Sequence, residues 1–538
     1  MRTIAFRCCR AALSCALAVL ALPLAAQLQA AAAKETIGWV PREILERPVT
    51  LRQGIGVAHQ KVTTSSPPAQ AFYDQALAYL NSYVWIEAAR SFNQALRLDP
   101  SLAMAYLGLS DAYIGLQDIG EAAAAFEKAR ALAEKVSDRE RSWVEIRALY
   151  FSFLANSSDM QKYFAYRKAI SDALTADPSD PFLWILRGFA DEGTPIAHGQ
   201  NGSIDTIAFY QTAVSFAPDS FIGHHYLAHT FENTGPMDKA LDQSAIYARL
   251  APAVPHAHHM YGHELRMAGR IDEAIAEFRK ADEIENAYYR SENIPAKYDW
   301  HHAHNLELLA MSYQTKGEMK AAEAAYRQAF SLPAYSDLAD YNRKAWPEFL
   351  LARERAEEAL GGARSLVESR WTLAQFAGHS LAGRALLRLG RTPEAEQELA
   401  LAEQQMQQFP KGAAERFPDA SHLRAEILLQ EKKWQEGNSV MAQVEQQLLA
   451  LPGPDSWSGA LFELESIAAL ARRLGDWELA ESTAQKIKEH DSSYGGAYYA
   501  LALSAEHRGD AAAARQFLAT ADRLWSGADQ DIRAQLRR

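Results

Sequence analysis

The feature that most constrains the fold of this chain is an internal repeat. Residues 69–100 read AQAFYDQALAYLNSYVWIEAARSFNQALRLDP, and the next stretch, SLAMAYLGLSDAYIGLQDIGEAAAAFEKARAL, repeats their pattern of small and aromatic positions. Each copy consists of two amphipathic helical segments joined by a short turn, and each hairpin leaves an apolar face that only a neighbouring hairpin can cover. The repeat therefore predicts a stack of helical hairpins, which accounts for a chain of 538 residues better than one ordinary core does.

These hairpins resemble tetratricopeptide repeats. In the first copy Ala76 and Ala88 take the positions where two helices cross, while Phe92 and Ala95 face the next unit. Further copies follow at HHYLAHTFENTG, HHMYGHELRMAG, HNLELLAMSYQTKG, HSLAGRALLRLG, LESIAALARRLG and YYALALSAEHRG. The resemblance implies an all-α, right-handed superhelical solenoid of tetratricopeptide-like helix-turn-helix repeats, and no stretch of the sequence reads as an alternating strand.

A narrower resemblance concerns three stretches of the chain. PREILERPV (residues 41–49), SYVWIEAARSF (residues 82–92) and the histidine-rich run of residues 224–305 resemble an exported bacterial family of tetratricopeptide repeat proteins that has no characterised function. This resemblance covers most of the chain and supports the fold. It implies nothing about chemistry.

The same pattern predicts an organisation into eight segments. They are a secretory signal peptide (1–33), an extended N-terminal segment (34–66), tetratricopeptide repeats (67–136), divergent helical hairpins (137–204), repeats with a histidine-rich concave face (205–345), tetratricopeptide-like repeats (346–450), C-terminal repeats (455–525) and a tail (526–538).

The N-terminus has the composition of a secretory signal. Arg2, Arg7 and Arg10 precede an apolar run over residues 11–26, and small residues at 30–33 offer cleavage sites. We therefore expect a periplasmic or secreted protein. All three cysteines lie within the signal, so the mature chain has neither a disulfide nor a thiolate ligand. No later apolar run is long enough to span a bilayer.

Composition and motifs argue against several functions. The net charge is −12 and no basic stripe is visible, which argues against a nucleic-acid partner. No glycine-rich loop follows a strand, so no nucleotide cofactor is expected. The GHS sequence at residues 378–380 lacks the strand-turn-helix setting of a nucleophile elbow, which argues against a serine hydrolase.

Ten of the 16 histidines lie between residues 224 and 304. On a helical wheel that starts at Tyr261, the apolar residues Tyr261, Gly262 and Leu265 share one side, whereas His256, His259 and His263 lie on the opposite side. In tetratricopeptide arrays, the resemblance implies, this opposite side of the first helix of each hairpin lines the concave surface. We therefore expect these three histidine side chains to line a groove.

The neighbouring repeats carry matching histidines. One repeat period upstream, His225 corresponds to His259 and His229 to His263, and Glu232 joins the same helix face one turn after His229. Downstream the offset is longer than one period, and His304 corresponds to His256. The extra residues lie around NAYYRSENIPAKYDWHH (residues 286–302), which we interpret as a loop that folds over the groove.

Six histidines from three helices are thus predicted to face one concavity. Two pairs have i, i+4 spacing, which places both imidazoles on one helix face where they can hold one divalent ion. Imidazole without thiolate suits copper or zinc, with iron as a further option, and six histidines plus Glu232 suffice for two ions. The predicted metal ligands are His225, His229, His256, His259, His263 and His304.

The other histidines have plainer interpretations. We interpret three of them, His224, His258 and His379, as packing residues at one shared position of the repeat, and the roles of His301 and His302 stay open. No role is assigned to His59, His198, His422, His490 and His507, although His59 could fold back from the N-terminal segment.

Three functions remain open from the sequence. The preferred one is an exported scaffold or binding protein with a transition-metal site in its concave groove. The second is a zinc- or copper-dependent metalloenzyme, hydrolytic or oxidative, in which Glu232 acts as general base on a metal-bound water. The third is a metal-free scaffold that binds a peptide or protein ligand in the groove.

Overall fold

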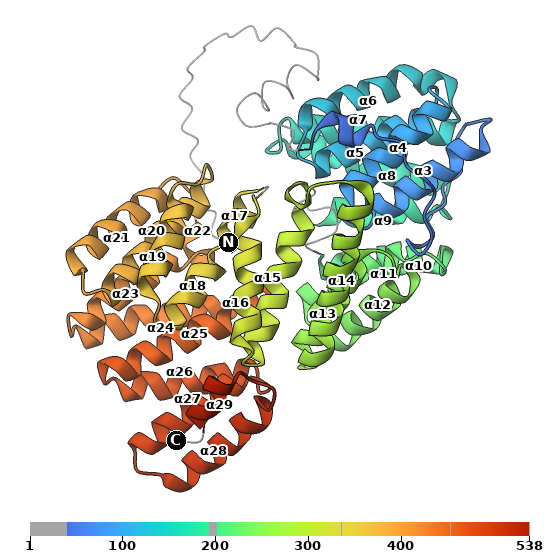
Figure 1. The fold of residues 1–538 in the computed structure, drawn as a ribbon. Helices are drawn as coiled ribbons and strands as arrows, with labels where there is room; N and C mark the ends of the chain where they lie inside the picture. The colour runs from blue at the N-terminus through green and yellow to red at the C-terminus, as the bar shows by residue number, and fades with distance from the viewer. Residues whose placement is uncertain (1–39, 193–201, 335, 411, 452, 537–538) are drawn as a thin grey trace, which may run out of the picture.

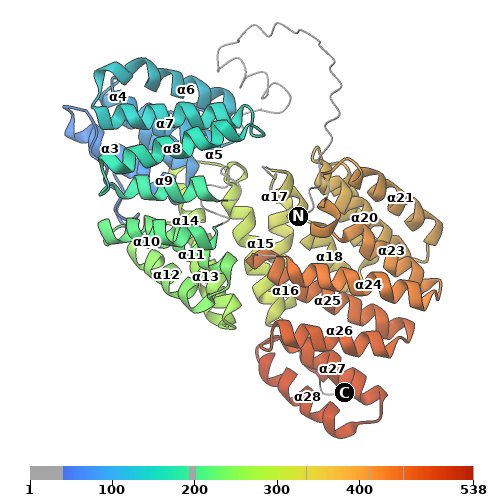
Figure 2. The ribbon, with the colours of Figure 1, turned by 180° about the vertical axis from the view of Figure 1, so that it is seen from behind.

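The computed structural model describes residues 40–192, 202–334, 336–410, 412–451 and 453–536, and all regular structure within them is helical, as predicted. The predicted signal peptide and His198 lie outside these residues. Successive helices pair into antiparallel hairpins that stack along the chain (Figure 1). Seen from behind, the N-terminal and C-terminal hairpins form two lobes on either side of helices α15 and α16 (Figure 2).

The N-terminal hairpins follow a short helix and a segment without regular structure. Their helices are α2 (Arg42–Leu45), α3 (Pro67–Leu80), α4 (Trp85–Leu98), α5 (Ala103–Gly115), α6 (Ile119–Leu132), the 3₁₀ turn η1 (Ala133–Lys135), α7 (Asp138–Leu154), α8 (Met160–Ala176) and α9 (Pro181–Asp191). Polar N-caps start several of them: Ser137 and Glu140 form a reciprocal capping box at α7, and Asp180 caps α9 with proline in the first helical position.

The middle hairpins carry the histidine-rich sequence. Their elements are η3 (Ile204–Thr206), α10 (Ile207–Phe216), α11 (Ile222–Thr234), α12 (Met237–Leu250), α13 (Pro255–Met267), α14 (Ile271–Glu292), η4 (Ala296–Tyr298), α15 (Trp300–Thr315) and α16 (Met319–Ser331). The first helices of three consecutive hairpins, α11, α13 and α15, lie next to one another. They therefore present one side-chain face in register.

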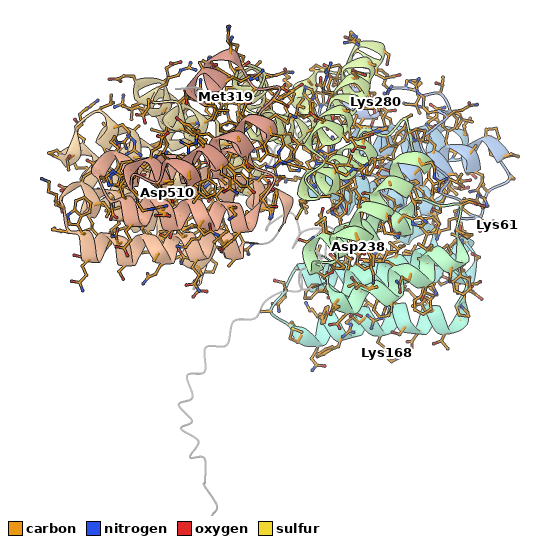
Figure 3. All side chains as sticks on the ribbon, turned by 90° about the horizontal axis from the view of Figure 1, so that it is seen from below. Lys61, Lys168, Asp238, Lys280, Met319 and Asp510 are labelled. Carbon is orange, nitrogen blue, oxygen red and sulfur yellow. The ribbon has the colours of Figure 1, made fainter. Side chains whose placement is uncertain are left out.

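The C-terminal lobe continues the same architecture. It consists of α17 (Asp337–Asn342), α18 (Ala345–Ala352), α19 (Ala356–Val367), α20 (Thr372–Arg388), α21 (Thr392–Met406), α22 (Ala413–Arg416), α23 (Asp419–Gln430), α24 (Trp434–Ala450), α25 (Pro454–Leu474), α26 (Trp477–His490), α27 (Gly495–His507), α28 (Ala511–Leu524) and α29 (Gln530–Leu536). Helix α29 lies in the segment predicted as a tail, and it buries Ile532 and Leu536. In Figure 3 Lys61 and Lys168 mark the N-terminal lobe and Asp510 the C-terminal lobe.

Small residues stand where the helices cross, as the repeat pattern predicts. A Cβ on Gly108 would lie 2.2 Å from the ring of Phe92, and one on Gly262 would lie 2.8 Å from the ring of Phe278. Both phenylalanine side chains are fully buried. The Phe92 ring therefore fills the space beside Gly108 in the next hairpin, and the Phe278 ring fills the space beside Gly262 in its own hairpin.

Most of the residues predicted as a loop over the groove are helical instead. Residues 286–292 extend α14 to 22 residues, and η4 leads from there into α15. The extension contacts the first repeat: Tyr288 donates a hydrogen bond to Glu87 (2.9 Å), and Glu292 pairs with Arg90 (2.9 Å) and Arg52. The sequence of this segment alone could not predict these contacts, because the partner residues lie far upstream in the chain. The insertion thus ties the third histidine-bearing hairpin to the first repeat.

Candidate metal centre

Seven histidines form one buried group, which we call the histidine cluster. Helix α11 contributes His225 and His229, helix α13 contributes His256, His259 and His263, and helix α15 contributes His301 and His304. The structure therefore brings together all six predicted ligands and adds His301, whose role the sequence left open. His302 is not part of the cluster; its ring contacts Tyr289 and Glu285.

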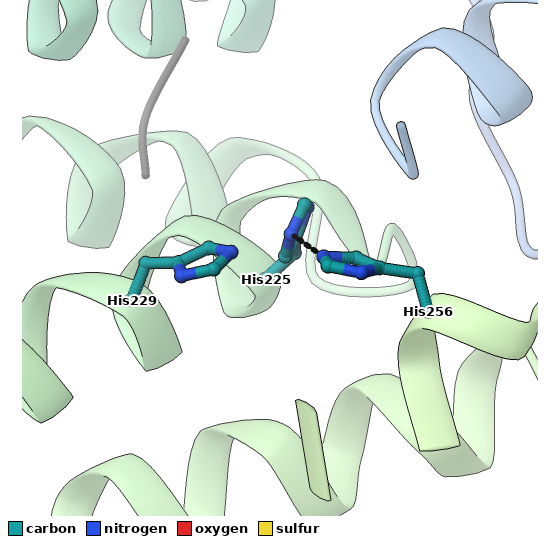
Figure 4. Close-up of side chains that lie close together, drawn as sticks. All are labelled: His225, His229 and His256. Carbon is teal, nitrogen blue, oxygen red and sulfur yellow. Dashed lines mark hydrogen bonds between the residues drawn. The ribbon is translucent and has the colours of Figure 1, made fainter. Parts of the chain in front are cut away.

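The cluster contains two triads that the repeat relates to one another. His225, His229 and His256 form the first, and His259, His263 and His304 form the second; in each, one nitrogen per ring lies within 4.8 Å of the others. The first two members are offset by one repeat period between the triads, and the third by more because of the insertion. Figure 4 shows the first triad. The same three-histidine arrangement is thus built twice by neighbouring repeats.

His301 lies between the two triads. Its ring centroid is 5.1 Å from that of His256 and 4.5 Å from that of His259, and these three residues form a further group of closely spaced nitrogens. Because His256 and His259 also belong to the triads, this group cannot hold an ion independently of them. His301 is therefore a side chain that either triad can recruit as an additional ligand.

Two ring nitrogens of the first triad have the spacing of metal ligands. His225 Nε2 and His256 Nε2 are 3.1 Å apart, as the dashed line in Figure 4 marks. Two imidazole nitrogens bound at about 2.05 Å to a tetrahedral zinc ion lie roughly 3.3 Å apart. The pair therefore fits a shared ion with only a small adjustment.

Hydrogen bonds on the far side of the rings orient four of these histidines. His225 Nδ1–H donates to the Asn81 carbonyl oxygen (2.7 Å), and the Nδ1 atoms of the other three face Glu232 (His229, 3.0 Å), Asn305 Oδ1 (His259, 3.0 Å) and Glu285 (His301, 2.5 Å). This arrangement leaves the Nε2 lone pairs of the four rings directed away from these acceptors, as in metal-binding histidines whose second nitrogen is held by an acceptor.

Several Nε2 atoms of the histidine cluster are buried without a hydrogen-bond partner among the described residues. Within the described residues, none of His229, His259, His263 and His301 has a hydrogen-bond partner at Nε2. A buried polar atom without a partner costs free energy, of the order of 1–3 kcal/mol each. Lone pairs gathered in this way are groups that a bound cation would satisfy.

Burial disfavours the charged form of four rings of the cluster. It lowers the pKa of His225, His256 and His259 well below the usual value, and the neighbouring histidines lower these pKa values further. The pKa of His304 is also lowered, first by burial, although Asp455 opposes this. Neutral imidazole is the form that binds metal, so these rings are ready for coordination at neutral pH.

Two carboxyl groups of the cluster differ in protonation. Burial opposes ionisation of Glu232, but hydrogen bonds and charge from His229 and His263 outweigh it and hold the pKa of Glu232 below its usual value. Burial and the nearby Glu232 raise the pKa of Glu264 well above its usual value. Glu232 is therefore favoured as an anion among the histidines, whereas ionisation of Glu264 next to it is disfavoured.

The prediction that these histidines line an open groove is wrong, because most of their side chains are buried. His225 and His259 are fully buried, and His256, His229 and His263 are 3%, 6% and 5% exposed. Among the seven cluster histidines only His304, whose side chain is 23% exposed, is partly accessible to solvent. These rings do lie opposite the apolar stripe of their own helices, but other parts of the chain cover them.

The turn between α3 and α4 forms much of that cover. The Tyr83 ring lies 4.8 Å from His225, 5.0 Å from His256 and 6.0 Å from His229, and Trp300 Nε1–H donates to the Tyr83 carbonyl oxygen. Tyr83 itself has φ +57°, an uncommon conformation for a bulky residue and one often found at functional sites. At the other end, Asp455 of α25 lies 3.9 Å from His304.

The remaining histidines lie elsewhere. His224, His258 and His379 share one position, as predicted, because each ring contacts the side chain 19 residues further on: Gln243, Glu277 and Glu398. His59 pairs with Asp74, His422 with Glu426 and Glu463, His490 with the Trp457 carbonyl, and His507 stacks on Trp477.

Sequence reasoning missed the groups that orient the rings. Asn81 lies 144 residues from His225, and no local pattern connects the two. Glu285 was detectable in principle, because it precedes the adjacent pair His301 and His302 by one hairpin turn and accepts a hydrogen bond from both. Asn305 follows His304 directly, and its amide is fixed by donation to the Phe278 carbonyl oxygen.

The fold and this site define a helical-repeat protein with a buried polyhistidine centre. The tetratricopeptide repeat profile matches residues 103–135, 255–288 and 303–336, so the chain carries tetratricopeptide repeats, and two of the matched stretches contain cluster histidines. A search of the curated proteins finds no match.

Solved structures of helical-repeat proteins match over most of the chain. Human IFIT1, as a dimer with m7Gppp-AAAA, is 13% identical with a TM-score of 0.36, over 87% of this chain and 92% of that chain. Yeast Tom70 is 15% identical with a TM-score of 0.34, over 87% of this chain and 93% of that chain. At these values neither match carries an inference about ligands. Across the described residues no helix combines the length and apolarity needed to cross a bilayer.

Proposed function

We propose that this chain is an exported tetratricopeptide repeat protein that binds two transition-metal ions in the histidine cluster. One observation carries the proposal: the two triads, His225–His229–His256 and His259–His263–His304, repeat one arrangement of buried imidazoles in consecutive hairpins. Packing alone does not require six polar rings at matching positions, whereas two equivalent metal sites do.

Chemistry narrows the identity of the ions. The donors are imidazoles, with Glu232 and Glu285 as carboxylates that orient them, and the described residues contain no cysteine. Such a set suits zinc or copper, and iron is the third choice. Three histidines leave a coordination position for water, another ligand or His301.

Glu232 fits an orienting role better than that of a general base. It hydrogen-bonds His229 and lies 3.6 Å from His263, so it is turned toward the ligands. Its pKa is held below the usual value, whereas an efficient base has a pKa near the working pH. Binding, storage or transfer of metal is therefore favoured over hydrolysis driven by this carboxylate.

The direct test is elemental analysis of the purified mature protein. After stripping with a chelator and reconstitution with zinc or copper, we expect two ions per chain, and a rise in unfolding temperature. At a free metal concentration 100-fold above the dissociation constant, each site adds about 2.7 kcal/mol of stability. Chelator-treated protein is the control. If no stoichiometric metal is retained with either ion or with iron, the proposal fails.

Export is the second part of the proposal. Its support is the arginine-flanked apolar segment of residues 2–26 followed by small residues. We expect expression in a Gram-negative host to yield periplasmic protein whose N-terminus, determined by sequencing, begins between residues 27 and 34. A variant without residues 2–26 is the control and should stay in the cytoplasm. Full-length protein that retains its N-terminus in the cytoplasm would contradict export.

A further inference from the structure

The N-terminal lobe encloses a second candidate site, a cavity of about 100 Å³ that is separate from the histidine cluster. Residues of α3, α4, α5, α7, α8, α9 and α11 line it, together with Gln60 and the turn after α3. No histidine lies in its wall. Its volume is of the order of the roughly 150 Å³ apolar cavity known to admit benzene, so one aromatic ring fits.

Nine aromatic side chains form much of the wall. They are Tyr73, Tyr83, Trp85, Trp143, Tyr150, Tyr166, Phe182, Phe189 and Tyr226. Several stand in pairs, with ring centroids 5.1 Å apart for Tyr83 and Trp85 and 5.4 Å apart for Tyr150 and Tyr166. The remaining exposed faces and edges of these rings favour a further ring packed beside them, by about 0.5–1.5 kcal/mol per pair beyond burial.

The charges in the wall cancel. Asp111 and Arg147 are the charged residues among the lining side chains, and they form an ion pair at 2.5 Å. Arg147 also lies over the ring of Tyr150, 5.2 Å from its centroid. Because the guanidinium is already paired, the cavity offers no free charge to an ionic ligand. A neutral molecule is the suitable occupant.

The wall nevertheless holds an unused hydrogen-bond donor. Trp143 Nε1–H is buried and finds no acceptor among the described residues, and an indole nitrogen can only donate. Gln60, which is 5% exposed, also has an amide nitrogen without a partner while its oxygen accepts from Tyr73. A ligand that carries an oxygen acceptor would satisfy such a group.

We propose that this cavity binds a neutral, single-ring aromatic molecule that carries an oxygen acceptor, with Trp143 as the donor to that oxygen. The apolar wall accounts for the ring, the paired charges for neutrality, and the free indole N–H for the acceptor. The site stands independently of the metal proposal. It adjoins the histidine cluster through Tyr83, whose ring contacts both the cavity and His225.

Two probes of matched shape test the proposal. Acetophenone has a ring and a carbonyl oxygen, whereas ethylbenzene has the ring without the oxygen. By calorimetry on the metal-free full chain, we expect both to bind and acetophenone to bind more tightly. In Trp143→Phe, acetophenone should lose about tenfold in affinity, the worth of one hydrogen bond, while ethylbenzene is unchanged.

Matched variants separate this result from a general effect on folding. Trp184→Phe is the control, because the Trp184 indole donates to the Pro178 carbonyl oxygen and does not line the cavity; it should leave both affinities unchanged. Leu107→Phe narrows the cavity and should weaken both probes, with thermal unfolding showing that the variant is folded. Three results would overturn the proposal: no binding to the wild type, equal effects of the two tryptophan variants, or binding that requires added zinc.

Discussion

Replacing His256 with leucine should remove one of the two bound metal ions and leave the other. His256 supplies the third imidazole of the first triad, and its Nε2 lies 3.1 Å from that of His225. Without it only His225 and His229 of helix α11 remain of that triad. Loss of an orienting partner alone costs metal affinity 10–100-fold, so loss of a ligand should cost at least about 100-fold. Competition with a chromophoric chelator measures both dissociation constants.

The matched control is His258→Leu. His258 lies on the same helix two positions away, but its ring faces Glu277 at 2.6 Å and belongs to no triad. We expect two ions to stay bound in this variant with unchanged affinities. The repeat relation adds a second comparison: His304→Leu should abolish the other site, because His304 takes the place of His256 in the second triad.

Stability in the absence of metal should move the other way. His256 is 3% exposed, and burial and its neighbours hold its pKa well below the usual value. Leucine removes this desolvated polar ring from the apo protein, and replacing poorly satisfied buried polar groups with apolar side chains is often neutral or stabilising. Metal-free His256→Leu should therefore unfold at the same or a higher urea concentration than the wild type. If it unfolds far earlier while both ions still bind, the histidine is a packing residue and the site assignment is wrong.

The fold followed from the sequence because its determinants are local and repeated. The crossing of Gly108 and Phe92 recurs at Gly262 and Phe278, and stacking of hairpins is the consequence of their exposed apolar faces. The exception is the segment around residues 286–292. Its tyrosines and charged residues suggested a loop, but contacts with Glu87 and Arg90 of the first repeat stabilise it as helix.

The residues of the site could be predicted from the sequence, but their burial by other parts of the chain could not. Helix periodicity placed His225, His259 and His263 on one face, and the constant length of the repeat connected neighbouring helices. The same periodicity cannot show what lies above that face. Tyr83 and Asp455, which cover the two ends, are far from the cluster histidines in the sequence. A surface that the wheel identifies as concave is here the inside of the molecule.

The stability of the metal-free protein should fall as the pH is lowered below about 6.5, the usual pKa of histidine. His225, His256 and His259 have folded-state pKa values well below it, because burial disfavours their charged forms. Below that pH the unfolded chain binds protons that the folded chain does not, so stability present above 6.5 is lost on acidification. Each such histidine contributes a slope of up to about 1.4 kcal/mol per pH unit.

Other titratable groups near the cluster change the stability with pH in the opposite direction. Burial lowers the pKa of His302, but its hydrogen bond to Glu285 outweighs this and raises it, so its contribution is present at low pH and lost as the pH rises. The raised pKa of Glu264 likewise gives stability that declines above pH 4.5. These terms oppose the three buried histidines. The contributions of His302 and Glu264 cancel in the difference in unfolding free energy between the wild type and His256→Leu, because both proteins contain these two residues.

Urea unfolding in chelator between about pH 7.5 and about pH 5.5 measures that difference. We expect the wild type to lose more stability over this range than His256→Leu, with the gap growing by up to about 1.4 kcal/mol per pH unit below 6.5. His258→Leu should follow the wild type, because that ring lies outside the cluster beside Glu277. Parallel curves for the wild type and His256→Leu would show that His256 takes up its proton in the folded state. In that case added zinc should not restore stability at low pH, because protons and zinc would compete for the same nitrogen of the folded His256 ring.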